Sequence, residues 1–122
     1  MDKVKSFEDL NVWKKRHQLV LRIYKITKDL PDEEKFGLVS QMRRAAVSIA
    51  ANIAEGFKKR GLRDKVNFYN IAQASLSELK YYLILVRDLN YVSEFRDSRE
   101  LIDEIGRMLT GLISSAPNYK NI

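Results

Sequence analysis

The sequence predicts a single all-α domain over residues 1–122, built from four helices. Apolar residues recur three and four apart in four segments, about 8–29, 34–59, 64–90 and 94–115, and this is the period of an α-helix. Only two prolines and five glycines interrupt the chain, so helix is favoured throughout. Short turns join the segments into antiparallel neighbours, and 122 residues suffice for one hydrophobic core.

The composition is typical of an ordinary soluble globular protein, with 45% hydrophobic and 31% charged residues. No run of about 18 apolar residues is present, and the charged N-terminal stretch lacks the apolar core of a signal peptide. The absence of cysteine removes disulfides and thiolate metal sites, which suits a reducing compartment. We therefore expect a soluble cytoplasmic protein without a membrane role.

The first predicted helix combines a broad apolar face with a basic outer side. Ser6 and Asp9 are spaced like a weak capping box at its start. The cations expected on the outer side are Lys14, Lys15, Arg22, Lys25 and Lys28. Such a row of cations can follow the phosphate backbone of a nucleic acid. A lysine-rich helix face is more often simply the solvent-exposed side of the helix. No motif that would contact base edges accompanies these cations.

His17 is the only histidine in the chain, and it falls between Trp13 and Val20 on an apolar stripe. A histidine in this setting is usually a packed residue whose ring nitrogen finds a partner. Di-iron bundles need Glu-x-x-His pairs from two helices, and zinc sites need several nitrogen or sulfur ligands. The sequence therefore predicts no metal site and no cofactor.

The second predicted helix is the most apolar, because its apolar positions form two parallel stripes offset by about 100°. The first stripe comprises Leu38, Met42, Ala45, Ile49, Asn52 and Gly56, and the second comprises Val39, Arg43, Ala46, Ala50, Ile53 and Phe57. A surface helix needs only one apolar face. We therefore expect this helix to be central in a bundle or to contact a second subunit.

Polar residues interrupt this apolar helix, and buried polar or charged groups need partners. The residues concerned are Gln41, Arg43, Arg44, Ser48, Asn52 and Glu55. Hydrogen bonds between helices or subunits are the first interpretation, and a binding or catalytic cluster is the second. Glu78, on the third predicted helix, is a candidate acceptor for Arg43 or Arg44.

The turns are marked by residues that end or cap helices. Pro31 ends the first helix, and the acidic residues after it suit the start of the second. Gly61 is interpreted as the stop of the second helix and Asp64 as the cap of the third. Pro117 ends the fourth helix and is followed by a short tail.

Two stretches carry a resemblance to a known family: SQMRRAAVSIAANIAEGFKKR at 40–60 and FYNIAQASLSELKYYL at 68–83. They resemble the bacterial four-helix-bundle family encoded by intervening sequences in large-subunit ribosomal RNA genes, which is similar to the accessory variability protein of diversity-generating retroelements. The match begins with FEDLNVW at 7–13 and runs nearly to the chain end. Ala51 departs from the pattern, because the family more often has proline there.

This resemblance implies an up-down-up-down antiparallel four-helix bundle that assembles as a ring-like homopentamer. For the retroelement relatives it also implies a basic surface that binds nucleic acid and a reverse transcriptase partner. No enzymatic activity belongs to the family.

The charge of the chain is concentrated in its first half. The net charge is +6 with an isoelectric point near 9.6, and residues 1–65 hold 16 Lys and Arg against 9 Asp and Glu. The turn between the second and third helices holds five cations and one Asp; the cations are Lys58, Lys59, Arg60, Arg63 and Lys65. They can serve as a polyanion-binding surface or as compensation for the helix dipole, and the sequence leaves both open.

Two functions are expected from the charge pattern together with the resemblance, and the assembly and the partner enzyme are implied by the resemblance alone. The first is a non-enzymatic oligomeric helper that binds RNA or DNA through a basic surface, together with a nucleic-acid-processing partner such as a reverse transcriptase. The alternative is a protein-protein interaction scaffold with no nucleic-acid role. An enzyme has the least support, because no nucleophile with a nearby base, metal cluster or cofactor loop is recognisable, and we expect no small-molecule substrate.

Overall fold

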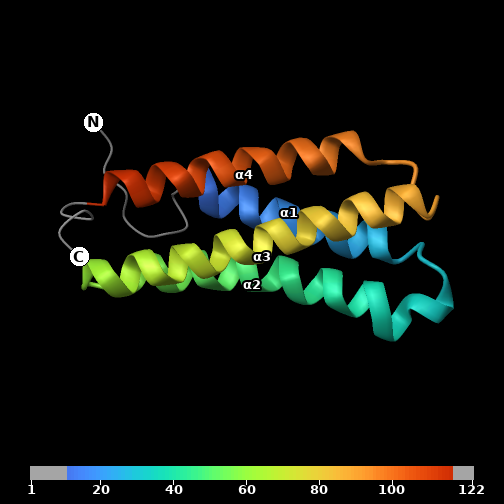
Figure 1. Cartoon of the computed structure of the whole chain (residues 1–122), viewed down its shortest axis with the longest axis horizontal. Helices are drawn as coiled ribbons and strands as arrows, with labels where there is room; N and C mark the ends of the chain where they lie inside the picture. The colour runs from blue at the N-terminus through green and yellow to red at the C-terminus, as the bar shows by residue number, and fades with distance from the viewer. Residues whose placement is uncertain (1–10, 117–122) are drawn as a thin grey trace.

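A computed structural model describes residues 11–116 as an antiparallel bundle of four helices (Figure 1). The helices are α1 (Asn11–Thr27), α2 (Ser40–Lys58), α3 (Leu62–Asp88) and α4 (Arg96–Ser115). They alternate in direction, and no strand occurs within 11–116. Helix α2 packs against α1 and α3, and α4 closes the bundle against α3 and α1. The predicted all-α fold is confirmed.

Both apolar stripes of α2 are buried within one chain. Met42, Ala45 and Ile49 of the first stripe and Ala46 and Ile53 of the second all belong to the hydrophobic core. The small alanines let neighbouring helices approach α2 closely. Because α1 and α3 cover both stripes, α2 occupies the central position in the bundle that the sequence offered as one of two explanations. Contact with a second subunit stays a prediction.

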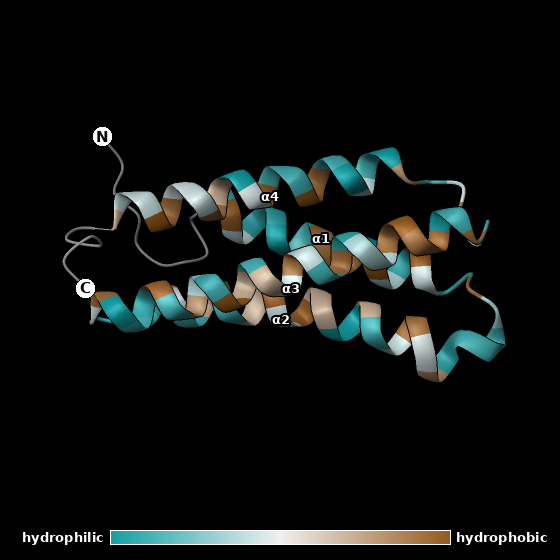
Figure 2. Cartoon of the chain, viewed as in Figure 1, coloured by the Kyte–Doolittle hydropathy of each residue, from teal (hydrophilic) through white to brown (hydrophobic). Residues whose placement is uncertain are grey.

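The hydropathy pattern explains how α4 joins this core. Figure 2 shows the hydrophobic bands of α4 on the side that faces the other helices, with hydrophilic residues outside. Leu101, Ile105 and Leu109 recur at helical spacing and are at most 6% exposed. This spacing buries one stripe and leaves the opposite side to water.

Helix α2 begins at Ser40, six residues later than the start at about residue 34 that the sequence predicts. A 3-10 turn, η2 (Asp32–Glu34), and a π-helical turn, η3 (Lys35–Val39), precede Ser40. Gly37 has non-helical angles of φ −107° and ψ −107°, and the Glu34 side chain accepts the Leu38 backbone N–H. The predicted helix from residue 34 is therefore interrupted by a kink at Gly37.

The remaining helix ends within the described residues lie within two residues of the prediction. Helix α3 begins at Leu62 with Gly61 as N-cap, so Asp64 lies in the first turn and does not cap the helix. Helix α4 begins at Arg96, and Glu94 accepts the Ser98 N–H from outside the helix. The predicted start of the first helix, with Ser6 and Asp9, lies outside the described residues, as do Pro117 and the tail.

Gly56 of α2 packs directly against Tyr69 of α3. A Cβ atom on Gly56 would lie 2.6 Å from Tyr69 Cε1 and 3.2 Å from the Lys65 backbone oxygen. Tyr69 is 2% exposed, so its ring has little freedom to move away. Any side chain at this position would therefore force the Tyr69 ring or the backbone to shift.

Candidate nucleic-acid interface

The α2–α3 turn consists of Lys59, Arg60 and Gly61, and it lies at the end of the bundle where α4 finishes (Figure 1). Lys59, at the C-cap of α2, and Gly61, at the N-cap of α3, both have extended backbone angles. The turn is therefore short and tightly connected to two long helices. We define the turn cluster as the five predicted cations of this region: Lys58, Lys59, Arg60, Arg63 and Lys65.

Lys65 reaches back from α3 to cap the end of α2. Its Nζ donates to the carbonyl oxygens of Gly56 at 2.8 Å and Phe57 at 3.0 Å. The same ammonium lies 5.9 Å from the centre of the Tyr69 ring, and burial lowers the pKa of Lys65. A cation on the last carbonyls of a helix offsets the helix dipole. Of the two interpretations of the turn cations, compensation of the helix dipole therefore describes Lys65.

The other members of the turn cluster face solvent to different extents. Lys59 lies 3.7 Å from Glu55 and 5.1 Å from the Phe68 ring centre, so its charge is partly compensated. Lys58, Arg60 and Arg63 are exposed. Lys58 and Arg60 form no ion pair with another residue of the described chain. The cluster thus divides into one capping residue, one paired residue and three exposed cations.

The predicted cations of α1 do not join the turn cluster in one patch. Lys15 pairs with Glu104 at 3.4 Å, and Arg22 lies 3.7 Å from Glu94. Lys14 and Lys25 are exposed. Lys25 is in the last turn of α1, which ends at the opposite end of the bundle from the turn cluster (Figure 1). Lys25 therefore lies apart from the turn cluster, and Lys15 and Arg22 are partly compensated by their acidic partners.

Arg43 and Ser48, both on α2, form hydrogen bonds to neighbouring helices. Arg43 Nε donates to Thr27 Oγ1 at 2.9 Å, and its guanidinium lies 4.5 Å from the Tyr24 ring centre. Ser48 and Ser75 share a hydrogen bond of 2.8 Å between α2 and α3. Asn52 donates to the Ser48 backbone oxygen at 2.8 Å. Arg43 and Ser48 thus join α2 to α1 and α3, whereas the Asn52 bond stays within α2.

Glu78 does not pair with Arg43 or Arg44 within the chain. Its carboxylate accepts the Tyr82 hydroxyl at 3.1 Å, one turn along α3. Arg43 is directed towards α1, while Arg44 and Glu78 are both exposed. The predicted pairing is wrong for the single chain, because the arginine that is partly buried finds its acceptor on α1.

His17 is exposed, in contrast to the packed position predicted for it. Its ring stacks on Trp13, with centroids 5.5 Å apart. Trp13 also supports the guanidinium of Arg16 at 4.7 Å, and burial lowers the pKa of Arg16 to about 10. Within residues 11–116, no three His, Cys, Asp or Glu side chains are grouped to hold a metal ion, and no helix could span a membrane.

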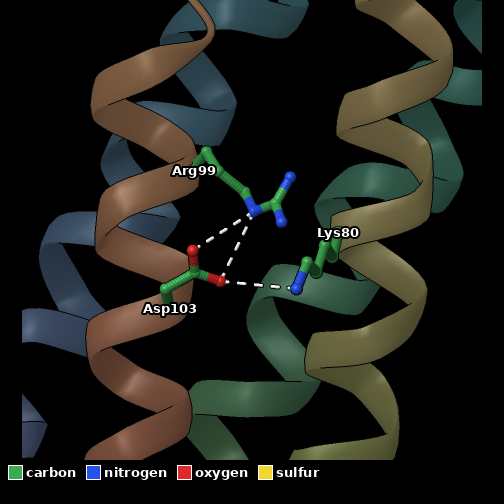
Figure 3. A network of polar contacts seen from close by, with 3 residues as sticks. All are labelled: Lys80, Arg99 and Asp103. Atoms are coloured by element: carbon green, nitrogen blue, oxygen red, sulfur yellow. Dashed lines mark hydrogen bonds and ion pairs between the residues drawn. The ribbon is translucent and has the colours of Figure 1, made fainter.

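Sequence reasoning missed a charged network between α3 and α4. Asp103 lies 3.5 Å from Lys80 Nζ across the helix pair and 3.3 Å from Arg99 Nε on its own helix (Figure 3). The Arg99 to Asp103 spacing is the i,i+4 pattern of helix ion pairs and was a detectable signal. The contribution of Lys80 depends on the helix packing and carries no sequence signal.

The fold and the polar contacts between its helices define a small antiparallel four-helix-bundle protein. The chain belongs to the family of 23S rRNA-intervening sequence proteins, whose family model matches residues 8–111. It is also similar to the crystal structure of a protein of unknown function from the S23 ribosomal protein family of Bacteroides thetaiotaomicron. The two are 29% identical with a TM-score of 0.78, over 85% of this chain and 96% of that chain. No curated protein matches the sequence.

Proposed function

We propose that this protein is a non-enzymatic, self-assembling nucleic-acid-binding protein whose turn cluster contacts the phosphate backbone. The observation that carries the proposal is the set of exposed cations at one end of the bundle: Lys58, Arg60 and Arg63, with Asp64 as the acidic residue beside them. Lys and Arg that neutralise phosphates release counterions, and this release drives binding to nucleic acid.

The rigidity of the turn supports this role. Gly56 holds Tyr69 in close contact, and Lys65 caps α2 through two carbonyl oxygens. The exposed cations therefore project from a backbone that is already ordered. Binding then loses less conformational entropy than it would with a flexible basic tail.

The turn cluster suits recognition without sequence preference. Phosphate contacts fix the position of a protein on nucleic acid, whereas base edges carry the sequence information. The exposed members of the cluster are long cationic side chains on a short turn and on the helix ends beside it. They do not place a helix face in a nucleic-acid groove. We expect similar affinities for RNA and DNA of the same length and strandedness.

Self-assembly would multiply this surface. The family resemblance implies a ring-like homopentamer, in which five copies of the turn cluster act on one strand. Linked weak sites gain affinity because the later contacts become intramolecular. Light scattering tests self-assembly. We expect the mass of several 14.2 kDa chains, and a mass of one chain would contradict self-assembly. On the basis of the same resemblance, we propose a reverse transcriptase as a protein partner.

Neutralising the exposed cations tests the proposal. The triple variant Lys58→Gln, Arg60→Gln, Arg63→Gln removes three charges and leaves Lys65 and the cap intact. We expect weaker binding to labelled RNA and DNA and a flatter dependence on salt, by about 0.7 per lost contact on a single strand. Lys35→Gln, an exposed cation on η3, is the matched control. Equal binding by the triple variant and the control would contradict the proposal.

The second candidate is a protein-interaction scaffold, and exposed apolar side chains favour it. Leu21 is 58% exposed and Tyr81 is 59% exposed, although single exposed apolar residues are common on protein surfaces. This scaffold would keep its protein partner when the turn cluster is neutralised. Loss of nucleic-acid binding in the triple variant supports the first candidate over the second.

A further inference from the structure

The middle of the α2–α3 helix pair has no charged residue. Residues 45–54 of α2 and 66–77 of α3 include no Asp, Glu, Lys or Arg, although 31% of the whole chain is charged. The 2.8 Å hydrogen bond between Ser48 and Ser75 places the two segments side by side. We define the α2–α3 face as the outer side of these segments, formed by Val47, Ser48 and Ala51 of α2 and by Ile71, Ala74 and Ser75 of α3.

Apolar side chains on the α2–α3 face are open to solvent. Val47 is 45% exposed and Ile71 is 40% exposed, and Ala51 and Ala74 are exposed as well. Val47 also lines a hollow together with Tyr24 of α1, so the apolar surface continues beyond α2. Depletion of charged residues, more than apolar content as such, distinguishes the centre of a protein-protein interface from ordinary surface.

Other exposed parts of the bundle carry charges. Lys14 and Lys25 are exposed on α1, and Asp97, Glu100 and Arg107 are exposed on α4. The α2–α3 face therefore differs from the outer sides of α1 and of residues 96–107 of α4. Its lack of charge is a local feature and does not describe the whole surface.

Two opposite charges border the α2–α3 face at one end. Arg44 lies one turn before Ser48, and Glu78 lies about one turn after Ser75. Because α2 and α3 are antiparallel, both residues are on the same side of the hydrogen bond between the two serines (Figure 1). Both are exposed, and neither forms an ion pair within residues 11–116. Each charge is therefore available to a partner outside the chain.

A second copy of this chain fits the α2–α3 face better than a nucleic acid does. Arg44 is the single cation at its border, and its centre offers phosphate no cation at all. A surface that carries one cation and one acid beside an apolar centre is complementary to another copy of itself, since the cation of each copy can meet the acid of the other.

We propose that the α2–α3 face is the surface through which the protein self-assembles, with Arg44 of one protomer paired with Glu78 of its partner. This inference rests on the self-assembly in the proposed function and names the surface responsible. Arg44 and Glu78 lie at a similar level along the bundle, so their pairing sets two protomers side by side in the same direction. The turn clusters then gather at one end of the assembly, beyond the interface.

A charge placed in the centre of the face tests the proposal. Ala51 is exposed in the single chain, so Ala51→Glu leaves the core unchanged. We expect it to weaken association by about a hundredfold or more, because the interface would bury a charge without a partner. Gln18→Glu, which adds the same charge at an exposed position of α1, is the matched control. Light scattering over a range of protein concentrations measures association, and circular dichroism confirms the helical fold.

Charge reversal tests the pairing across the interface. We expect Arg44→Glu and Glu78→Arg each to weaken association by about tenfold or more, because like charges then face each other. The double variant Arg44→Glu, Glu78→Arg restores opposite charges and should associate within about threefold of the wild type. A double variant as weak as the single variants would overturn the pairing.

The outcomes separate this surface from the proposed function. If the wild-type chain assembles and Ala51→Glu assembles as Gln18→Glu does, the α2–α3 face is not the interface, while self-assembly stands. A wild-type mass of one chain would overturn both the face and self-assembly, and the salt dependence of nucleic-acid binding would still decide the turn cluster. A single-chain mass with a different protein displaced by Ala51→Glu would assign the face to that protein and overturn the proposal.

Discussion

The Lys65 ammonium lies 2.8 Å from the carbonyl oxygen of Gly56, so a side chain from the first turn of α3 caps the last turn of α2. A second bond, to the Phe57 carbonyl oxygen at 3.0 Å, completes the cap. The two helices are thereby joined at the point where the exposed cations of the turn cluster begin. We therefore assign a role in stability to Lys65 and a role in nucleic-acid binding to the exposed cations of the cluster.

Lys65→Met tests the capping role. Methionine keeps an apolar stem against Phe57 and Tyr69 but cannot donate to the carbonyl oxygens. We expect the free energy of unfolding to fall by about 1–2 kcal/mol, the range for hydrogen bonds from a charged group that is partly exposed. Lys58→Met, on the exposed side of the turn, should change it by less than about 0.5 kcal/mol. Urea unfolding measures both, and equal effects would contradict the cap.

Gly56→Ala tests the close approach of α2 and α3. The added methyl group would lie 2.6 Å from Tyr69 Cε1, so the ring or the backbone must shift. We expect a loss of about 1–3 kcal/mol, as for other overpacked cores. Gly111→Ala is the control, because a Cβ added there would meet no neighbouring atom within 4 Å and alanine favours helix by about 1 kcal/mol. Thermal unfolding should therefore move the two midpoints in opposite directions.

Arg43→Leu and Arg44→Leu compare two adjacent arginines. Arg43 donates to the buried Thr27 hydroxyl, whereas Arg44 is exposed. We expect the Arg43 variant to lose about 1–2 kcal/mol of stability, since it leaves Thr27 without this donor, and the Arg44 variant to stay within about 0.5 kcal/mol. Chemical denaturation decides between them, and a stable Arg43 variant would show that the bond to α1 is dispensable.

The helical core was predictable because hydrophobic spacing depends only on residues within one helix. The stripes through Met42, Ile49 and Ile53 are buried as their spacing requires. The break before Ser40 was not predictable, because the π-helical turn around Gly37 depends on how the chain returns from α1. The turn cluster was located correctly in the sequence, but its division into capping and exposed cations was not.

Contacts between helices explain the other differences. Glu78 was matched to Arg43 by charge, yet the packing directs Arg43 to Thr27 and leaves Glu78 with Tyr82. The same limit hid the ion pair between α3 and α4, since Lys80 and Asp103 are far apart in sequence and meet only in the bundle. The spacing of residues within a helix predicts which face of the helix is buried. Only the packed structure shows which residues of other helices that face contacts.

Binding of labelled RNA and DNA by the wild-type chain across a range of salt concentrations tests the central claim most directly. We predict that the logarithm of affinity falls linearly with the logarithm of salt concentration, with a slope of about −2 or steeper on a single strand. Three phosphate contacts, from Lys58, Arg60 and Arg63, at about 0.7 each, account for that slope. Absence of binding even at low salt would contradict the nucleic-acid role and leave the scaffold as the remaining candidate.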